Sequence, residues 1–244
     1  MKKIFFLLYV VVAVICISIT SCSPKSKLSV EEHALVAMDW EGESLVFEPI
    51  EGSREEILAK HADERSKSPI TYMLPVNLGS DTLNVMEKYT DNLVSVEVYR
   101  NDLLEVSIDA GVISPINNFR GLWLDEGHWF LEVAHVEEDP VDPNAAFIIW
   151  GEIFQDGESL NEKFGYGEAF NFQILNGEPF FFFSEDGEIG FSYDGEETAL
   201  RYSDIPHYQC CSGAAFNPLP AEKMVSFYAT KEVVRYYVEI GAFK

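Results

Sequence analysis

Residues 168–202 read EAFNFQILNGEPFFFFSEDGEIGFSYDGEETALRY, and this stretch decides the fold class. Three turn dipeptides divide it: Asn176-Gly177, Asp186-Gly187 and Asp194-Gly195. Asn-Gly and Asp-Gly are strong hairpin signals, because the tight turns that match strand twist need positive φ at both central residues. The pieces between the turns have the length of strands and are rich in aromatic and β-branched residues. The stretch therefore predicts a four-stranded antiparallel meander.

The second predicted strand of this meander contains the aromatic run Phe180–Phe183. Successive side chains of a strand point to opposite faces, so this run places aromatic rings on both faces of its sheet. The preceding strand alternates instead, with Phe170, Phe172 and Ile174 separated by polar residues. A strand that is apolar on both faces must be covered on both, so we expect a second sheet or a neighbouring blade against it.

Further strands are expected on both sides of the meander. Residues 119–164 predict a second meander, and residues 224–243 predict a closing hairpin. Residues 69–76 predict a strand, whereas residues 80–92 are ambiguous because their apolar residues recur at helical spacing. The fold class expected from these patterns is mainly β, with antiparallel meanders that form a sandwich or a partial propeller-like arrangement.

One short helix is expected near residues 53–63. Ser53 and Glu56 fit a capping box, in which each side chain accepts a hydrogen bond from the other residue's free backbone N–H. Ile57 and Leu58 would then face the core.

Residues 177–208 resemble one WG-type repeat. That family combines a strand, a glycine turn, a second strand with an aromatic residue and glycine, and a closing segment with tyrosine and isoleucine. The matching positions are Asp186-Gly187, Gly190-Phe191, Asp194-Gly195 and residues 202–205. The family's tryptophan is replaced by Ile189, and no second copy is evident. The resemblance implies a binding or scaffold unit, and the mature chain also resembles exported bacterial proteins of uncharacterised function.

The composition sets limits on the partners of the chain. Its 244 residues include 17 Lys and Arg against 41 Asp and Glu, which gives a formal net charge of −24. Such a surface repels the phosphates of nucleic acids and anionic lipid headgroups. We therefore expect no nucleic-acid partner, and membrane contact only through an anchor.

The N-terminus has the pattern of an export signal. Lys2 and Lys3 precede an apolar run at residues 4–19, which is shorter than the roughly 20 residues of a membrane span. The run ends in Ile19-Thr20-Ser21-Cys22, which resembles the lipobox of bacterial lipoproteins. The resemblance implies that Cys22 becomes the mature N-terminus and carries fatty-acid chains such as palmitate.

The expected organisation follows from this signal. Residues 1–21 are a signal peptide, residues 22–36 a tether, and residues 37–244 a single β-rich domain with a candidate sub-boundary near residues 110–118. The protein is expected on the extracytoplasmic side of a bacterial cell envelope, at the outer membrane if the organism has one.

The chain contains no nucleophile elbow, phosphate loop, dinucleotide fingerprint, HExxH or EF-hand pattern. One predicted hairpin is crowded with Asp125, Glu126, His128, Glu132 and His135, so a hydrolase that uses the carboxylates near Asp125–Glu132 is one alternative. Two of the five histidines, His33 and His61, have no partner in view. We expect no cofactor and no metal. Whether the chain is an enzyme stays open, and the absence of a catalytic pattern favours a protein that is not one.

A second alternative involves His207, Cys210 and Cys211. Adjacent cysteines bond only in a distorted tight turn, because their Cα atoms are about 3.8 Å apart and disulfides usually need at least about 4.4 Å. Three states stay open: a disulfide between Cys210 and Cys211, two free thiols, or a metal site that includes His207. We expect the pair to be structural.

These observations favour a lipid-anchored, extracytoplasmic β-rich protein that binds a ligand or partner without catalysing a reaction. The aromatic excess could line a groove for a carbohydrate or a peptide, since aromatic faces stack on the apolar faces of sugar rings. The residues themselves do not name the protein or carbohydrate ligand.

Overall fold

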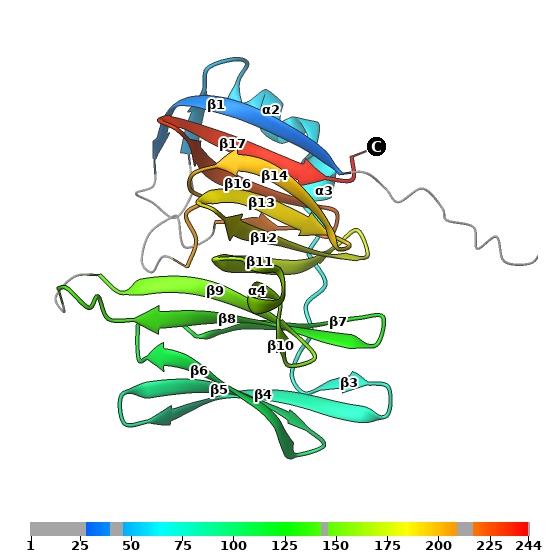
Figure 1. The fold of residues 1–244 in the computed structure, drawn as a ribbon. Helices are drawn as coiled ribbons and strands as arrows, with labels where there is room; N and C mark the ends of the chain where they lie inside the picture. Colours follow the sequence, from blue (N-terminus) through cyan, green and yellow to red (C-terminus); the bar gives the residue numbers. More distant parts are fainter. Residues whose placement is uncertain (1–27, 40–45, 143–145, 209–216, 244) are drawn as a thin grey trace, which may run out of the picture.

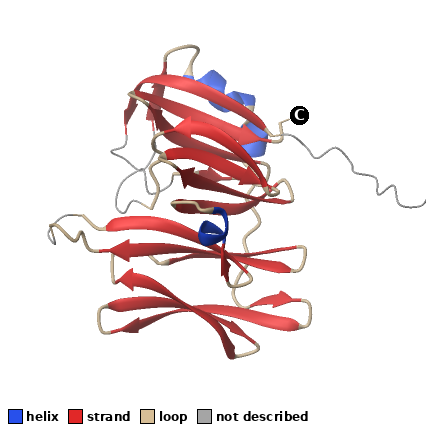
Figure 2. Cartoon of the chain, viewed as in Figure 1, coloured by secondary structure: helices blue, strands red, loops and turns tan. Residues whose placement is uncertain are grey.

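Strands make up most of the chain in the computed structural model, which describes residues 28–39, 46–142, 146–208 and 217–243 (Figures 1 and 2). They form three sheets, which we name the upper, central and lower sheets. The upper sheet has the order β15 (Leu219–Pro220), β16 (Met224–Lys231), β17 (Val234–Gly241), β1 (Ser29–Asp39) and β2 (Val46–Pro49). The central sheet has the order β11 (Glu168–Leu175), β12 (Glu178–Glu185), β13 (Glu188–Tyr193) and β14 (Glu196–Tyr202).

The lower sheet has eight strands and curls over its own core. Its order is β10 (Glu158–Ser159), β9 (Ile148–Gln155), β8 (His128–Glu137), β6 (Leu103–Val112), β5 (Leu93–Arg100), β4 (Asp81–Thr90) and β3 (Val76–Leu78), while β7 (Phe119–Asp125) also pairs with β8. Residues such as Val96, Trp129 and Leu131 are fully buried between its two halves. Strands β6 and β8 run parallel where they meet, and the other described strand pairs are antiparallel.

The central sheet confirms the meander predicted from residues 168–202. The first residues of its three turns, Asn176, Asp186 and Asp194, have φ values of 52°, 52° and 50°, as the turn dipeptides require. Phe182 pairs with Phe170 on one side and with Phe191 on the other. The fold class predicted from the sequence, a mainly β chain of antiparallel meanders, is thus confirmed.

Both faces of the aromatic strand are covered, as its sequence predicts. Phe182 packs towards the upper sheet, where its ring lies 4.9 Å from that of Phe227. Phe183 points to the opposite face, and its ring stacks on Tyr166 at 4.4 Å within a core that includes residues of β8 and β9. Figure 1 shows the central sheet between the upper sheet and strands β9 and β8. The molecule is therefore a stack of sheets.

Three short helices complete the described chain: α2 (Arg54–Lys60), α3 (Ala62–Arg65) and α4 (Leu160–Phe164). The capping box of Ser53 and Glu56 is present at the start of α2. Ile57 is buried against Leu35 and Phe47, so α2 covers one face of the upper sheet. No helix in the described ranges is both long and apolar enough to cross a membrane.

Two local predictions need correction, and one open question is resolved. Residues 69–75 form no strand and run from α3 to the lower sheet, because prolines without an N–H group interrupt the segment. Residues 81–90 form strand β4, because pairing with β5 outweighs the helical spacing of their apolar residues. Strand β1 begins at Ser29, within the predicted tether of residues 22–36, because its backbone pairs with β17 from that residue onward.

Candidate functional site

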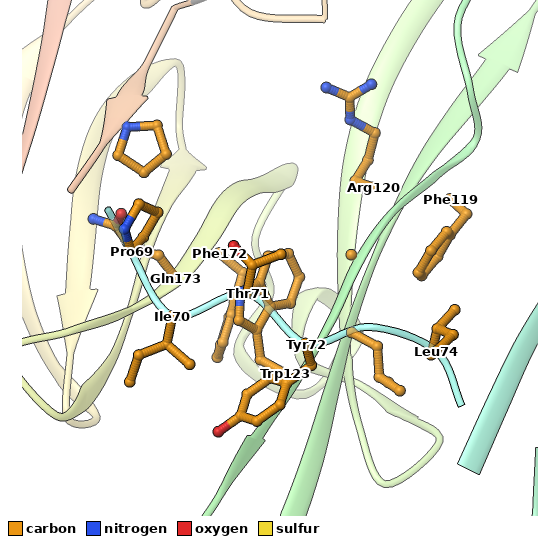
Figure 3. Close-up of a pocket in the computed structure, with 13 residues that line it drawn as sticks. Pro69, Ile70, Thr71, Tyr72, Leu74, Phe119, Arg120, Trp123, Phe172 and Gln173 are labelled. Carbon is orange, nitrogen blue, oxygen red and sulfur yellow. The ribbon is translucent and has the colours of Figure 1, made fainter. Parts of the chain in front are cut away.

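A groove opens where strands β7 and β11 and the segment Pro69–Leu74 meet (Figure 3). Its larger part has a volume of about 310 Å³ and its smaller part about 230 Å³. The two parts share Arg120, Trp123, Phe172 and Pro220, so they are continuous. We call this feature the β7–β11 groove.

The larger part of the groove is mostly aromatic and aliphatic. Tyr72 comes from the connecting segment, Phe119 and Trp123 from β7, and Phe172 from β11. The ring of Trp123 lies 5.0 Å from that of Phe172. Strand β7 pairs only with β8 among the described strands, so its other edge forms no sheet ladder there.

Gln173 is a residue of the groove wall whose amide has neither of its polar atoms hydrogen-bonded among the described residues; the side-chain nitrogen of Asn171, in the smaller part, also has no partner there. The Gln173 side chain lines the larger part and is 2% exposed. A buried amide without partners costs about 1–3 kcal/mol. A ligand in the groove that accepts from the nitrogen and donates to the oxygen would remove this cost.

The β7–β11 groove owes its shape to a β-bulge at Asn171. The register between β11 and β12 shifts between Phe170 and Gln173, and Asn171 has a φ of 56°. A bulge frees backbone N–H groups from the ladder. Here the N–H groups of Asn171 and Phe172 donate to the two carboxylate oxygens of Glu132 on β8, at 3.0 and 2.6 Å.

Glu132 receives a third hydrogen bond from the hydroxyl group of Tyr208, at 2.5 Å. Burial and the charge of Glu132 raise the pKa of Tyr208 well above its usual value, so the hydroxyl stays protonated and donates. The guanidinium carbon of Arg120 lies 5.0 Å from the centre of the Tyr208 ring. Glu132 thereby joins β8, β11 and the chain after β14 beneath the groove.

His207 lies beside Glu132 in the smaller part of the groove and is held in its charged form. Its Nδ1 lies 2.6 Å from the carbonyl oxygen of Ile205, and its Nε2 lies 2.8 Å from a carboxylate oxygen of Glu168. Both partners are acceptors, so both ring nitrogens donate, which requires the imidazolium. The ring also stacks on Phe170 at 3.7 Å, a contact that favours a cation.

The pKa of His207 agrees with this geometry. Burial acts to lower it, but the hydrogen bond and charge of Glu168 outweigh burial and raise it above its usual value. Glu168 also accepts from the backbone N–H of Gly151 at 2.8 Å. A Cβ at position 151 would lie 2.5 Å from the carbonyl oxygen of Ala169, so only glycine allows this approach of β9 to β11.

The carboxylates that the sequence grouped on one hairpin lie in different places. Asp125 pairs opposite His128 at the end of the β7–β8 hairpin, and His128 is bound to Asp156 at 2.5 Å. Glu132 lies four residues further along β8, a distance of about 13 Å along the strand. Glu132 thus belongs to the groove, whereas Asp125, Glu126 and His128 lie at the hairpin end.

The cysteine predictions concern residues that the structure does not describe. Cys22, Cys210 and Cys211 lie outside the described ranges, so lipidation and the state of the cysteine pair stay predictions. His207, the third residue of the predicted metal alternative, is described, and both of its nitrogens are engaged. A metal ion would bind there only after displacing Ile205 or Glu168.

Sequence reasoning missed Arg120, Trp123, Asn171 and Gln173 as groove residues. One signal was available: Gln173 is a polar residue within the apolar strand FNFQIL, on a strand buried on both faces. Arg120 and Trp123 carry no comparable pattern, because only the stacking of β7 against β11 brings them to the groove.

The fold and the groove define a class, namely mainly β proteins of stacked antiparallel sheets with an aromatic groove between two of them. Comparison of the chain with protein-family models, with curated proteins and with solved structures gave no match.

Proposed function

We propose that this chain is a lipid-anchored extracytoplasmic protein of a bacterial envelope, and that its β7–β11 groove binds an oligosaccharide without catalysing a reaction. The export signal and the lipobox-like sequence that ends at Cys22 support the location. The WG-type resemblance of residues 177–208 supports a binding role over a catalytic one.

The observation that carries the binding proposal is the unpartnered amide of Gln173 in a wall of aromatic side chains. Sugar rings offer an apolar face to Trp123 or Tyr72 and hydroxyl groups that both donate to and accept from an amide. Arg120 adds further donors at the junction of the two parts of the groove.

Charge favours a neutral sugar over an anionic one. The chain has a formal net charge of −24, which repels anions over the whole surface. Within the groove, the positive charges of Arg120 and His207 are balanced by two carboxylates. These are the buried Glu132 and Glu168, the partner of His207 Nε2. An uncharged oligosaccharide of a few rings therefore fits the groove better than an acidic polymer or a nucleic acid.

Binding is tested by calorimetric titration of the full-length chain in detergent with neutral and N-acetylated oligosaccharides of three to six rings. We expect Trp123→Ala to weaken binding at least tenfold, because the stacking surface is lost. Phe164→Ala, which removes an aromatic ring 49% exposed on α4 that lines neither part of the groove, should bind like the parent chain.

Gln173→Leu gives a sharper test. Replacing an unpartnered amide by an apolar group of similar size should leave the free energy of unfolding unchanged or raise it, yet binding should be lost. If no oligosaccharide binds the folded parent chain, or if Gln173→Leu binds as well as the parent, the groove is not a sugar site.

A further inference from the structure

A second group of polar side chains lies on the upper sheet, far in sequence from the groove residues. Strands β1 and β17 are antiparallel neighbours, and Glu31 lies directly opposite Glu239. His33 lies two residues from Glu31 and opposite Tyr237, so all four side chains share one face of the sheet. Leu35 and Tyr237 belong to the core beneath α2, which identifies this face as the one that the helices cover.

Two carboxylates placed directly opposite each other on neighbouring strands repel, so the pair needs positive charge. Ligand atoms of Glu31, His33 and Glu239 all lie within 4.8 Å of one another. The side chain of Glu239 is fully buried, and its Oε2 has no hydrogen-bond partner in the part of the chain that the structure describes. His33 Nε2 also has no hydrogen-bond partner among the described residues.

The other oxygen of Glu239 is firmly held. Its Oε1 accepts from the guanidinium of Arg65 on α3 and from the hydroxyl of Tyr237, the latter at 2.8 Å. Partners of this kind orient a carboxylate that binds a metal ion with its remaining oxygen. The carboxylate of Glu239 is thus fixed in place beside the other two side chains, and its Oε2 is left without a hydrogen-bond partner among the described residues.

Glu31 is held more loosely. Its carboxylate is bound by Lys60 at 2.6 and 2.7 Å and lies 3.3 Å from His61 Nε2. The Lys60 side chain is 56% exposed, and exposed ion pairs contribute about 0–1 kcal/mol, so a cation can displace it at little cost. Arg65 remains close and opposes a second positive charge, which limits the affinity.

We propose that Glu31, His33 and Glu239 bind a divalent transition-metal ion of the zinc type. Zinc accepts carboxylate and imidazole ligands, and three protein ligands leave a fourth position for water. The imidazole disfavours calcium and magnesium, which prefer oxygen ligands alone. The strongly acidic surface raises the local concentration of cations near the site. The ion holds β1 to β17 and joins the start of the described chain to its end.

The test must separate this site from the cysteine pair. We would use the untagged full-length chain, purified in detergent without chelator, with Cys210→Ser and Cys211→Ser as the parent for all variants. Zinc chloride is titrated calorimetrically into the parent, into parent plus His33→Gln, and into parent plus His128→Gln. His128 is a matched control, since it is an exposed histidine bound to a carboxylate elsewhere in the molecule.

We expect one zinc ion per parent chain, binding at least tenfold weaker in His33→Gln, and unchanged binding in His128→Gln. His33→Gln is preferred to Glu239→Gln, because His33 Nε2 makes no hydrogen bond among the described residues. Loss of the Glu239 charge, in contrast, would leave the guanidinium of Arg65 without its carboxylate partner. Circular dichroism and the melting temperature confirm that each variant is folded.

A second readout identifies the ligands. Zinc should raise the melting temperature of the parent and not that of His33→Gln. Cobalt in the parent should give visible absorption of a nitrogen and oxygen site without a thiolate band. Absence of zinc binding in the folded parent, or equal binding by His33→Gln, overturns the proposal.

Discussion

Glu132 joins strands of two different sheets through a single carboxylate. Its three donors are the N–H groups of Asn171 and Phe172, freed by the bulge in β11, and the hydroxyl of Tyr208. Successive N–H groups at a backbone position with positive φ form a natural site for an anion. At residue scale, this contact fixes the floor of the groove.

We predict that Glu132→Gln lowers the free energy of unfolding by about 3 kcal/mol. The substitution keeps the shape but places an amide NH₂ against donors, and each hydrogen bond to a charged group contributes about 1.5–3 kcal/mol. Urea unfolding followed by tryptophan fluorescence measures the change. Glu137→Gln, an exposed position on the same strand, should change stability by about 0.5 kcal/mol or less; equal effects would contradict the role of Glu132.

A second prediction at the residue scale concerns His207 and the dependence of stability on pH. The folded pKa of His207 is raised above its unfolded value, so its contribution to stability is full below the unfolded pKa of about 6.5 and is lost as pH rises through the folded pKa. Glu168, Glu132 and Asp204 supply the negative charge around the ring.

The comparison is between the parent chain and His207→Gln at pH 6 and at pH 9. We expect the parent to exceed the variant in free energy of unfolding by about 1.5–3 kcal/mol at pH 6, and the gap to narrow at pH 9. A gap that is constant or that widens with pH would show that His207 does not act as a buried cation.

At the scale of elements, β12 determines how the sheets stack. Its four consecutive phenylalanines alternate between the core shared with the upper sheet and the core shared with β8 and β9. The strand cannot lie at the surface of a two-layer protein, because one aromatic face would then be exposed to water. The three-layer order of the molecule follows from this strand.

We predict that Phe182→Ala lowers the free energy of unfolding by about 3–5 kcal/mol, since the ring is fully buried and contacts Phe170, Phe180 and Phe227. Phe164→Ala, which removes a ring 49% exposed on α4, should cost about 1 kcal/mol or less. Chemical denaturation of both variants measures the two changes in the free energy of unfolding. Similar decreases in both variants would mean that the core is not centred on β12.

At the scale of the whole molecule, the order of the sheets places the first and last described strands side by side. Strands β1 and β17 pair from Ser29 to Ala34. The predicted anchor at Cys22 lies seven residues before β1 in the sequence. An anchored chain would therefore approach the membrane from the upper sheet.

The anchor prediction is tested on native protein. Mass spectrometry of the N-terminus should find a chain that begins at Cys22 and carries a diacylglyceryl group, because two acyl chains hold a protein stably at a membrane and one does so only marginally. Cys22→Ala should release the protein from the membrane fraction. An intact Met1, or an unmodified Cys22, would contradict the lipobox interpretation.

The sequence by itself determined the features that depend on a few neighbouring residues. Turn dipeptides with positive φ placed the hairpins of the central sheet, Ser53 and Glu56 marked the start of α2, and the run Phe180–Phe183 required cover on both faces. Local signals left residues 81–90 undecided between helix and strand, and pairing with β5 makes them a strand.

Only the tertiary structure decided the two candidate sites. Glu132 and Phe172 are 40 residues apart in the chain and meet across a bulge, and Glu31 meets Glu239 because the first and last described strands pair. Such contacts depend on which sheets stack and which strands are neighbours. Those choices are made by the burial of whole apolar faces, to which single polar residues such as Glu31 and His33 contribute no recognisable pattern.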